Sequence, residues 1–517
     1  MSFVGTLFPY QEEAVNLMCE RGKVLVAYDL GLGKTVLTIA AIERLRDEGK
    51  IDGPGLVVCL SSLKYQWANA IDKFTGHTSF PVVIDGTPKQ RKAQYDQFKT
   101  SQVDYIILNY EQVVNDYDYL KTMNFSFIIA DEATALKSFK SKRSKNTKKL
   151  KSNIRFALTG TPVENGKAEE VFSIMEFVDK KVLGSYPSFE AKYINRNGMG
   201  WIDGYKNLNE LHHSLKVTSV RKRQSDPDVS PYLPETIMAA PLLVPFDPSS
   251  KKLYNAICDM LLEDLDEAAT YINSGVSIYT NDGGLIDDFR GRIMPKLIAL
   301  RQVCAHPNLL KSSGLKFDGF AGNGSLFAAE LLELGLLDRE FRTPKLETLK
   351  ETISNFLAED PKNKAVIFTT FVGMTDILGK ELKEHGANIY TGRMNAKEKE
   401  LAKVDFQTNP GTRLLVSSDA GGYGVDLPQA NLLVNYDLPW NAGLALQRNG
   451  RIQRASSTWE HVVIQDLLML GSIEQRQYDM LQQKMSVANA IVDGEGIGKN
   501  GELKLTLGTL RQFLQDI

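Results

Sequence analysis

Two stretches of the chain show the same alternation of short apolar runs and helical segments. In the first, residues 23–165, the apolar runs are VLVAY, LVVCL, YIILN, SFIIA and RFAL; in the second, residues 364–467, they are AVIFT, RLLVS, NLLVN and HVVIQ. Short apolar runs that alternate with helices are typical of the buried strands of parallel sheets. The sequence therefore predicts an α/β protein with two similar parallel-sheet lobes, and its 517 residues are enough for two large domains.

The region between these stretches, roughly residues 169–343, has a different pattern. Helical periodicity dominates it, and loops such as SDPDVSPYLP and NDGG interrupt it. The predicted helices outside the lobes are Phe189–Tyr193, Lys251–Tyr271, Phe289–Cys304, Leu326–Leu337 and a long one over Ile473–Ala488. The predicted domains are residues 1–225 for the first lobe with a helical protrusion, 226–342 for a linker and helical insertion, 343–472 for the second lobe and 473–517 for C-terminal helices.

A glycine-rich segment, GLGKT, follows the apolar run VLVAY and opens a predicted helix. In this position glycines let backbone N–H groups approach phosphates, and the amino terminus of a helix favours an anion. Lys34 would then reach the β- and γ-phosphates of a nucleotide, and the Thr35 hydroxyl would bind Mg²⁺. Tyr28 stands where the general pattern has its first glycine, so a plain glycine-rich turn is the alternative. The nucleotide-binding candidates here are Gly31, Leu32, Gly33, Lys34 and Thr35.

Two acidic residues, Asp131 and Glu132, come directly after the apolar run SFIIA. A carboxylate at the end of a buried strand can bind Mg²⁺, and its neighbour can orient or activate an attacking water. Taken alone, the pair is better explained as the acidic first turn of a helix, but the upstream GKT favours a nucleotide site. Further along, LTGTP (Leu158–Pro162) follows RFAL; its hydroxyls either link the nucleotide site to another surface or belong to a plain turn.

Two segments concentrate positive charge in a chain whose formal net charge is -2. The first, QRNGRIQR (Gln447–Arg454), has three arginines and no acid, which by itself suits a solvated helix face. The second runs from Ala133 to Val163 and has no acidic residue. A polyanion would have to bind at such a local patch, and a solvated loop is the alternative. The cations of the second segment are Lys137, Lys140, Lys142, Arg143, Lys145, Lys148, Lys149, Lys151 and Arg155.

These segments, together with others in the same order, make the chain resemble a superfamily 2 helicase-type ATPase, and within that group the SWI/SNF-like branch of DNA translocases. GLGKT, the Leu-Lys after the acidic pair and LRQVCAHP point to this branch rather than to RNA helicases. The matching segments are LFPYQ (7–11), DLGLGKT (29–35), CLSSLKYQW (59–67), ILNYE (107–111), DEATALKS (131–138), ALTGTPVEN (157–165), LRQVCAHP (300–307), TPKLETL (343–349), VIFTTF (366–371), SSDAGGYGVDL (417–427) and QRNGRIQR (447–454).

The resemblance implies two RecA-like lobes with ATP in the cleft between them, Mg²⁺ beside the phosphates, and helical insertions and a C-terminal helix that brace the lobes. Adenine would be read by Gln11 beside Phe8 and Tyr10, and Gly424 and Asp426 match the segment that couples the nucleotide to lobe closure. On the same resemblance, the catalytic set is Lys34, Asp131, Glu132, Gln447, Arg451 and Arg454.

The resemblance implies that Gln447, Arg451 and Arg454 face the phosphates held by the other lobe, and arginine suits this role for a physical reason. The guanidinium group is planar and always charged, and it can pair bidentately with phosphate oxygens. A cation that arrives only on closure stabilises the transition state over the open state. The chain departs from the family where Thr134 replaces a histidine, where Asp426 replaces a common asparagine, and after Arg454, where ASS replaces the usual IGQ.

The resemblance also marks residues that contact the nucleic-acid backbone in relatives. Contacts of this kind position the backbone and read few bases, so we expect little sequence preference. The predicted nucleic-acid contacts are Ser62, Lys64, Asn109, Tyr110, Lys137, Lys140, Thr369, Thr370 and Arg393.

We therefore expect an ATP- and Mg²⁺-dependent motor that walks along double-stranded DNA as a monomer. A helicase that separates or anneals strands at replication or recombination intermediates is one alternative, and a nucleotide-gated DNA-binding scaffold with negligible turnover is another. No apolar run reaches the roughly 18 residues of a membrane span, and we expect an intracellular protein, in the cytoplasm of a bacterium or a virus-infected cell or in a eukaryotic nucleus. Protein partners in replication, recombination or repair are left open.

Overall fold

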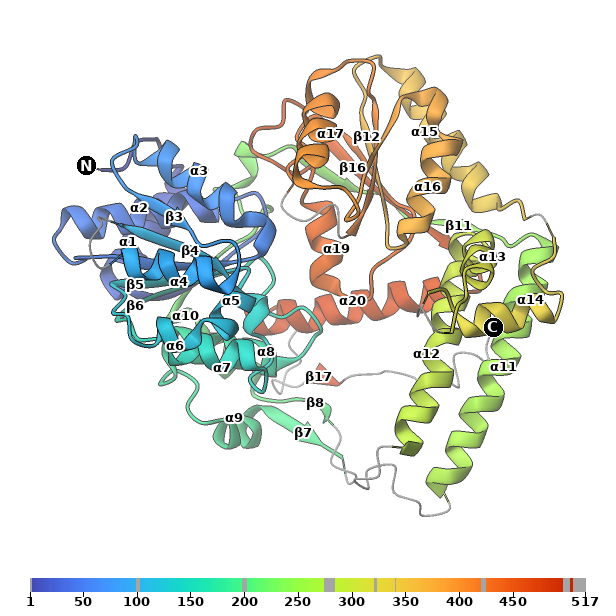
Figure 1. The fold of residues 1–517 in the computed structure, drawn as a ribbon, viewed down its shortest axis with the longest axis horizontal. Coiled ribbons are helices and arrows are strands. Elements are labelled where there is room, and N and C mark those ends of the chain that lie inside the picture. The colour runs from blue at the N-terminus through green and yellow to red at the C-terminus, as the bar shows by residue number, and fades with distance from the viewer. Residues whose placement is uncertain are drawn as a thin grey trace. The chain divides into compact units, whose positions relative to one another are not determined.

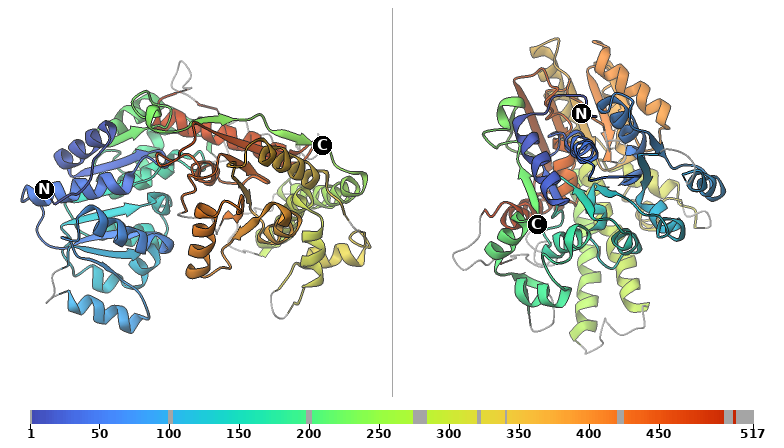
Figure 2. Two further views of the ribbon diagram at one scale, coloured as in Figure 1. Left: turned by 90° about the horizontal axis from the view of Figure 1, so that it is seen from above. Right: turned by 90° about the vertical axis from the view of Figure 1, so that its left-hand side faces the viewer.

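The protein consists of two compact units (Figures 1 and 2). The computed structural model describes residues 2–98, 103–197, 202–273, 284–319, 323–339, 341–419, 425–495 and 503–504. Over these residues, unit 1 comprises Met1–Pro234, Asn441–Ser457 and Gln482–Leu505, and unit 2 comprises Glu235–Trp440 and Thr458–Leu481. Unit 1 therefore contains the arginine-rich segment as well as the phosphate-loop candidate. The predicted domain boundaries stay a prediction.

The core of unit 1 is a parallel sheet whose described strands have the order β3-β4-β2-β5-β6-β1-β9. Along β1 the side chains alternate between two apolar clusters, because successive side chains of a strand point to opposite faces. Val24, Val26 and Tyr28 enter one cluster, and Leu25 and Ala27 enter the other. The strands are β1 Lys23–Tyr28, β2 Gly55–Cys59, β3 Pro81–Val83, β4 Tyr105–Asn109, β5 Phe127–Asp131, β6 Ile154–Leu158 and β9 Ser219–Lys222.

Helices cover both faces of this sheet (Figures 1 and 2). One face packs against α1 (Pro9–Arg21), α2 (Lys34–Asp47) and α3 (Lys64–Phe74). The other packs against α5 Tyr110–Asn115, α8 Ala168–Asp179, α9 Tyr186–Tyr193, α10 Leu208–Lys216 and the last turns of α20 Ile473–Val492. The remaining elements are α4 Pro88–Gln97, α6 Tyr117–Leu120, α7 Lys142–Lys149, α19 Ala442–Asn449, the short helices Ser61–Leu63, Ala133–Leu136 and Ser230–Tyr232, and the antiparallel strands β7 Ile194–Arg196, β8 Ile202–Tyr205 and β17 Leu503–Lys504.

Unit 2 contains a second parallel sheet with the order β10-β16-β15-β12-β14-β13, and β11 also pairs with β16. The strands β12, β14 and β15 are buried along their whole length. The strands are β10 Glu235–Met238, β11 Leu242–Val244, β12 Ala365–Thr369, β13 Ala387–Tyr390, β14 Leu414–Ser418, β15 Leu432–Asn435 and β16 His461–Met469; the helices beside them are α15 Pro344–Glu359, α16 Val372–Glu381, α17 Ala396–Thr408 and the short helix Lys383–His385.

A helical part of unit 2 lies between β11 and β12 in the sequence and has an apolar cluster of its own, which includes Leu253, Leu300 and Leu331. Its helices are α11 Pro248–Asn273, α12 Gly284–Ala305, α13 Asn308–Leu315 and α14 Leu326–Glu333. The predicted fold class, two parallel-sheet lobes with helical insertions, is confirmed. The predicted helices at 189–193, 251–271, 289–304 and 326–337 correspond to α9, α11, α12 and α14, and the predicted long helix at 473–488 corresponds to α20.

Candidate nucleotide and nucleic-acid site

The segment GLGKT forms the loop between β1 and α2. Gly31 and Gly33 have φ angles of 83° and 79°, in the left-handed region that favours glycine. A Cβ atom added at Gly33 would lie 2.4 Å from Gln11 Nε2, so this position has no room for a side chain. Gly33 is also the N-cap of the 14-residue helix α2. The backbone N–H groups of the first turn of α2 therefore face the loop, which is the geometry that binds phosphate.

Lys34 lies at the start of α2, close to the end of β1. Its Nζ donates hydrogen bonds to the carbonyl oxygens of Tyr28 at 2.8 Å and Asp29 at 3.1 Å. Burial lowers the pKa of Lys34, and the carboxylates of Glu132 and Asp131 act in the opposite direction. The ammonium group is thus held by two backbone carbonyls at the carboxyl end of the sheet, in the electrostatic field of the two carboxylates.

The Asp131 carboxylate, at the end of β5, has a fixed orientation. Its Oδ2 accepts a hydrogen bond from Trp67 Nε1 at 2.8 Å, and its Oδ1 accepts one from the backbone N–H of Glu132 at 2.9 Å. The Tyr110 hydroxyl donates to the carbonyl oxygen of Asp131 at 2.7 Å. Burial raises the pKa of Asp131, while the bond from Trp67 opposes that shift. Trp67 was not predicted as a site residue, although it belongs to the matching segment CLSSLKYQW.

Glu132 has an unusual backbone conformation for a residue with a side chain. Its φ of 47° and ψ of 56° lie in the left-handed region, which costs about 1–3 kcal/mol for residues other than glycine. Such strain is common at functional sites. Burial, and next the charge of Asp131, raise the pKa of Glu132 to about 7, and Lys34 and Arg451 oppose the shift.

The arginine-rich segment Gln447–Arg454 spans the end of α19 and the turn after it, and it belongs to unit 1. Gln447 Nε2 donates to Glu132 Oε2 at 3.4 Å. A Cβ added at Gly31 would lie 2.7 Å from Arg454 Nη1. Gln447, Arg451 and Arg454 are each 7% exposed, so none of them lies on a solvated helix face. The structure therefore brings all six predicted catalytic residues together: Lys34, Asp131, Glu132, Gln447, Arg451 and Arg454.

The predicted adenine residues form an aromatic group beside the loop. The rings of Phe8 and Tyr10 stack with centroids 5.6 Å apart, and Tyr232 packs on Phe8 at 4.5 Å. Gln11 accepts a hydrogen bond from the Phe8 backbone N–H at 3.0 Å and donates one to the Leu32 carbonyl at 3.0 Å. Its amide thus joins the aromatic group to the phosphate loop. Tyr232 was not predicted, because it comes from the loop SDPDVSPYLP, more than two hundred positions away in the sequence.

The predicted nucleic-acid contacts of unit 1 differ in accessibility. Ser62 and Lys140 are exposed. Lys64 is buried and donates to the Ile84 carbonyl at 2.9 Å, and Tyr110 is buried beside Asp131. The Asn109 side chain caps α5, and Lys137 forms an ion pair with Glu164 at 2.6 Å.

The predicted nucleic-acid contacts of unit 2 also form bonds within their own unit. The Thr369 hydroxyl donates to the Asp437 carboxylate, whose other oxygen accepts from the Thr370 backbone N–H at 2.7 Å. Arg393 is exposed and pairs with Asp376 at 2.9 Å. Of the two residues predicted to couple the nucleotide to lobe closure, Asp426 is exposed and Gly424 lies outside the described residues. The roles assigned to these positions stay predictions.

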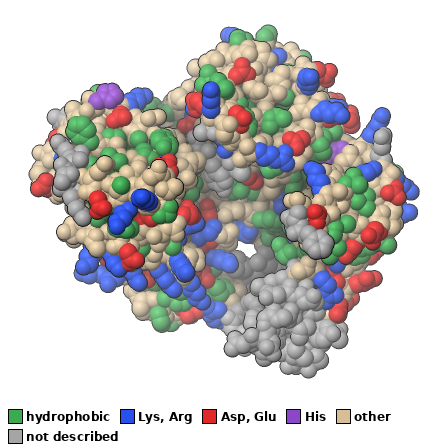
Figure 3. All heavy atoms as spheres, in the orientation of Figure 1, with side chains coloured by type: hydrophobic (Ala, Val, Ile, Leu, Met, Phe, Trp, Pro, Cys, Tyr) green, Lys and Arg blue, Asp and Glu red, His purple; other side chains and the backbone are tan. Residues whose placement is uncertain are grey.

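The basic segment of residues 133–163 divides into two sets of cations. In the first set, Lys137 pairs with Glu164, Arg143 with Glu111 and Lys148 with Glu176, and Arg155 donates to backbone carbonyls of its own unit. A second set on α7 and the turns beside it is exposed, and Lys and Arg side chains gather along the lower edge of unit 1 in Figure 3. The exposed lysines are Lys140, Lys142, Lys145, Lys149 and Lys151.

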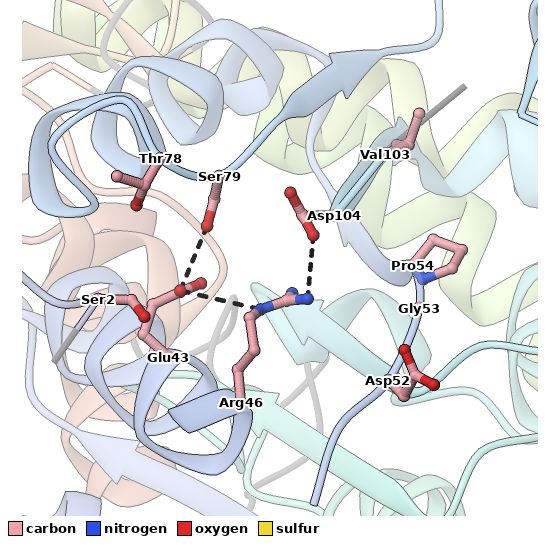
Figure 4. Close-up of a pocket in the computed structure, with 10 residues that line it drawn as sticks. All are labelled: Ser2, Glu43, Arg46, Asp52, Gly53, Pro54, Thr78, Ser79, Val103 and Asp104. Atoms are coloured by element: carbon pink, nitrogen blue, oxygen red, sulfur yellow. Dashed lines mark hydrogen bonds and ion pairs between the residues drawn. The ribbon is translucent and has the colours of Figure 1, made fainter. Parts of the chain in front are cut away.

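A polar pocket of about 460 Å³ lies elsewhere in unit 1 (Figure 4). Its residues Gly53, Pro54 and Asp104 precede β2 and β4, so it lies at the amino ends of the strands, whereas ligands of open parallel sheets bind at the carboxyl ends. The buried Glu43 in this pocket accepts hydrogen bonds from Tyr105 at 2.5 Å and Ser79 at 3.2 Å. The pocket is therefore separate from the predicted nucleotide site.

Among the described residues, no three His, Cys, Asp or Glu side chains gather closely enough to bind a metal ion between them. The predicted Mg²⁺ ligands, Thr35 and Asp131, stay a prediction. No helix in the described part of the chain combines the length and the apolar character that crossing a bilayer requires.

Two known protein families match this chain. Residues 10–309 match the family described as SNF2-related domain, and residues 344–456 match the helicase conserved C-terminal domain. The helicase domain of Hef from Pyrococcus furiosus shares the fold, with a TM-score of 0.51 and 18% identity over 91% of this chain and 97% of that chain. The fold is therefore that of a helicase core.

The chain belongs to the SNF2-related family of helicase-type ATPases, which confirms the resemblance seen in the sequence. It is 26% identical to a Bacillus subtilis protein named "Putative ATP-dependent helicase/translocase YwqA", over 96% of this chain and 50% of the relative. It is also 26% identical to the ISWI chromatin-remodeling complex ATPase ISW1 of Saccharomyces cerevisiae, over 94% of this chain and 41% of that protein. The chain thus spans half or less of the length of these relatives.

Proposed function

We propose that the chain is an ATP-hydrolysing motor that moves along double-stranded DNA. One observation carries the proposal: the lysine and glycines of the phosphate loop, the two acids after β5 and the arginine-rich segment meet at one place in unit 1. Gln447 bonds to Glu132, and Arg454 borders Gly31. Residues separated by about three hundred positions or more thus surround a single loop that suits a polyphosphate.

The residues present fit ATP. Gly31 and Gly33 carry no side chains and have φ angles in the left-handed region, so phosphate oxygens can approach the backbone N–H groups of the loop and of α2. Lys34 would hold the β- and γ-phosphates, and Arg451 and Arg454 would stabilise the charge that spreads over the transferred phosphoryl group. Glu132, with its pKa raised to about 7, would orient the attacking water and accept its proton. When bound, Mg²⁺ would neutralise phosphate charge, with Thr35 and Asp131 as its ligands.

The DNA part of the proposal is supported by relatives and by charge. The Bacillus relative is named as a helicase/translocase and the yeast relative as a chromatin-remodelling ATPase. The exposed lysines of α7 supply a local cation field in a chain of net charge -2. Neutralising DNA phosphates with such lysines releases counterions, so binding should weaken as salt rises. We propose that the protein acts as a monomer; strand separation or annealing and a DNA-binding scaffold remain the alternatives.

The proposal is tested by measuring ATP hydrolysis without nucleic acid and with single-stranded DNA, duplex DNA or RNA. The same samples are assayed for displacement of a triplex-forming strand and for separation and annealing of a duplex. We expect duplex DNA to stimulate turnover, and triplex displacement without duplex separation. Separation or annealing of strands would instead favour the helicase, and turnover unaffected by any nucleic acid would refute both motors. The Lys34→Ala variant serves as the background control.

A further inference from the structure

The phosphate loop has a second set of contacts on the side away from the acids of β5. Strand β9 pairs with β1 in parallel, and Ala27 lies opposite Arg221. Arg221 Nη1 donates to the Ala27 carbonyl at 2.9 Å and to the Asp29 carboxylate at 2.5 Å. Arg221 Nε and Nη2 donate to the two oxygens of Asp493 at 2.8 Å and 3.3 Å. One guanidinium group thus bonds both to Asp29, the first residue of the loop, and to Asp493, directly after α20.

The first residues of the loop, Asp29 and Leu30, are held by further bonds from the end of β9 and from the segment after it. The Asp29 backbone N–H donates to the Lys222 carbonyl at 3.0 Å, and the other oxygen of the Asp29 carboxylate accepts from the Gln224 backbone N–H at 3.1 Å. Gln224 Nε2 donates to the Leu30 carbonyl at 2.9 Å. The carbonyl of Asp29 is in turn one of the two that hold Lys34 Nζ. A displacement of Asp29 would therefore move the acceptor of the phosphate-binding lysine.

Asp493 is itself held in place by packing. It comes directly after α20, whose residues Val487, Ala490 and Ile491 are buried in the core of unit 1. Its side chain is only 6% exposed, and its pair with Arg221 spans 272 positions of sequence. Ion pairs with this little exposure are screened weakly by solvent, and an arginine fork gives the pair a defined direction.

We propose that Arg221 and Asp493 are positioning residues that hold the phosphate loop in its binding conformation. This inference rests on the proposed function, because it takes the loop to be the site of the ATP phosphates. Asp493 and Asp29 share the donors of one planar guanidinium group, so the direction in which Arg221 holds Asp29 depends on Asp493. Without the Asp493 carboxylate, Arg221 can rotate towards Asp29 or towards water, and the entry of the loop loses its fixed position.

The chain offers a matched control two residues further on. Glu495 is at the same end of α20 and pairs with Arg223, which also bonds to Asp226. No described contact joins this pair to Asp29 or Leu30. Asp493→Asn and Glu495→Gln therefore remove the same charge from the same place, but only the first affects the partner of Asp29.

The experiment measures the dissociation constants of a fluorescent ATP analogue and of ADP, the KM and kcat for ATP, and the thermal unfolding midpoint. We expect Asp493→Asn to weaken nucleotide binding and raise KM by about three- to thirtyfold, with a smaller change in kcat. Glu495→Gln should match the parent, and Asp493→Glu should restore most of the affinity. Arg221→Lys should weaken binding by a similar factor, and the double variant Arg221→Lys/Asp493→Asn should lose less than the product of the two effects.

The outcomes separate this inference from the proposed function. Equal nucleotide affinity in Asp493→Asn, Glu495→Gln and the parent would overturn the inference, as would equal losses in the two variants. If Asp493→Asn unfolds at a lower temperature, binding is measured below that midpoint, and recovery in Asp493→Glu decides between a lost fold and a displaced loop. A parent that neither binds nor hydrolyses ATP would instead refute the proposed function.

Discussion

Each unit of the molecule is built on a parallel sheet, but the turns that follow one inner strand of each sheet, β1 in unit 1 and β12 in unit 2, differ. In unit 1, β1 leads into a loop with glycines in the left-handed region, and the first turn of α2 opens onto that loop. In unit 2, β12 ends at Thr369, whose hydroxyl donates to the Asp437 carboxylate. The backbone N–H of the next residue, Thr370, donates to the same carboxylate. The donors at the end of β12 are thus satisfied within the protein, whereas those of the glycine loop suit an anion.

This difference shows that a parallel sheet supplies only a position for a site. Ligand chemistry depends on the few residues at the carboxyl ends of the strands. Unit 1 has glycines, a lysine and two acids there, and unit 2 contributes a compact hydroxyl–carboxylate turn. Four predictions test the comparison, in order of decreasing effect.

The largest effect is expected at the phosphate loop. Lys34→Ala should reduce ATP hydrolysis by about 10³-fold or more, because a cation on the transferred phosphoryl group contributes on this scale. DNA binding, measured by a mobility or anisotropy assay, should change little. Turnover equal to that of the parent would contradict the assignment of this loop to the phosphates.

In unit 2, the largest effect should fall on stability. Lys345 Nζ lies 2.7 Å from both carboxylate oxygens of Glu474, and the two side chains are 0% and 2% exposed. Lys345→Met would leave a buried charge without its partner, which costs about 3–5 kcal/mol. Hydrogen exchange of peptides from α15 and β15 should report the loss.

The control for that variant is Lys350→Ala. Lys350 pairs with Glu381 at 2.6 Å but is 30% exposed, so its removal should cost no more than about 1 kcal/mol. Similar exchange rates in the two variants would show that burial of the Lys345 pair has no special importance. The double variant Lys345→Met/Glu474→Met should recover much of the lost stability, since it removes both charges.

A smaller effect is expected at Trp67, which donates a hydrogen bond to the Asp131 carboxylate. Trp67→Phe keeps an aromatic ring in the core and removes the N–H that donates to the carboxylate. If Asp131 binds Mg²⁺, the Mg²⁺ concentration for half-maximal hydrolysis should rise by about tenfold, as for other partners of metal ligands. Tyr65→Phe, which removes an exposed hydroxyl from the same helix, is the control and should leave this concentration unchanged. An unchanged Mg²⁺ requirement in Trp67→Phe would count against the role of Asp131.

The smallest effect should come from the exposed lysines. Replacing Lys142, Lys145 and Lys149 with Gln should lower the slope of log Kd against log salt by about 0.9 for each DNA phosphate that the variant no longer neutralises. The double variant Lys89→Gln/Lys92→Gln, on the exposed face of α4, tests whether any surface lysine has this effect. Equal slopes in the parent and the α7 variant would place the DNA elsewhere on the protein.

Long apolar strands were predictable from the sequence, and short edge strands were not. The runs VLVAY and SFIIA became β1 and β5, because a strand buried on both faces must be apolar throughout. Strand β9, by contrast, has the sequence SVRK at the edge of its sheet, and β10 is mostly exposed. An edge strand with polar residues has no pattern that distinguishes it from a loop.

The candidate site shows the same division. Lys34, Asp131 and Glu132 were identified because each lies just beyond an apolar run, and the glycines of the loop mark a tight turn. Trp67 was not predicted as a site residue, and Tyr110 was predicted only as a nucleic-acid contact; the structure shows that the polar atoms of both side chains bond to Asp131. Lys64 was predicted to contact nucleic acid, but its ammonium group bonds to the Ile84 carbonyl inside the unit.

The fold class, the family and the phosphate loop could be predicted from the sequence, since apolar runs, glycines and acids act through neighbours a few positions away. The resemblance had already put Gln447 and Glu132 in one catalytic set, and the structure shows the bond between them. Only the structure shows that Asp493 bonds to Arg221, across 272 positions. This is because the local order of apolar, polar and glycine residues reflects only the strand, helix or turn in which those residues lie. Contacts between distant segments depend on how whole elements pack, which no local pattern encodes.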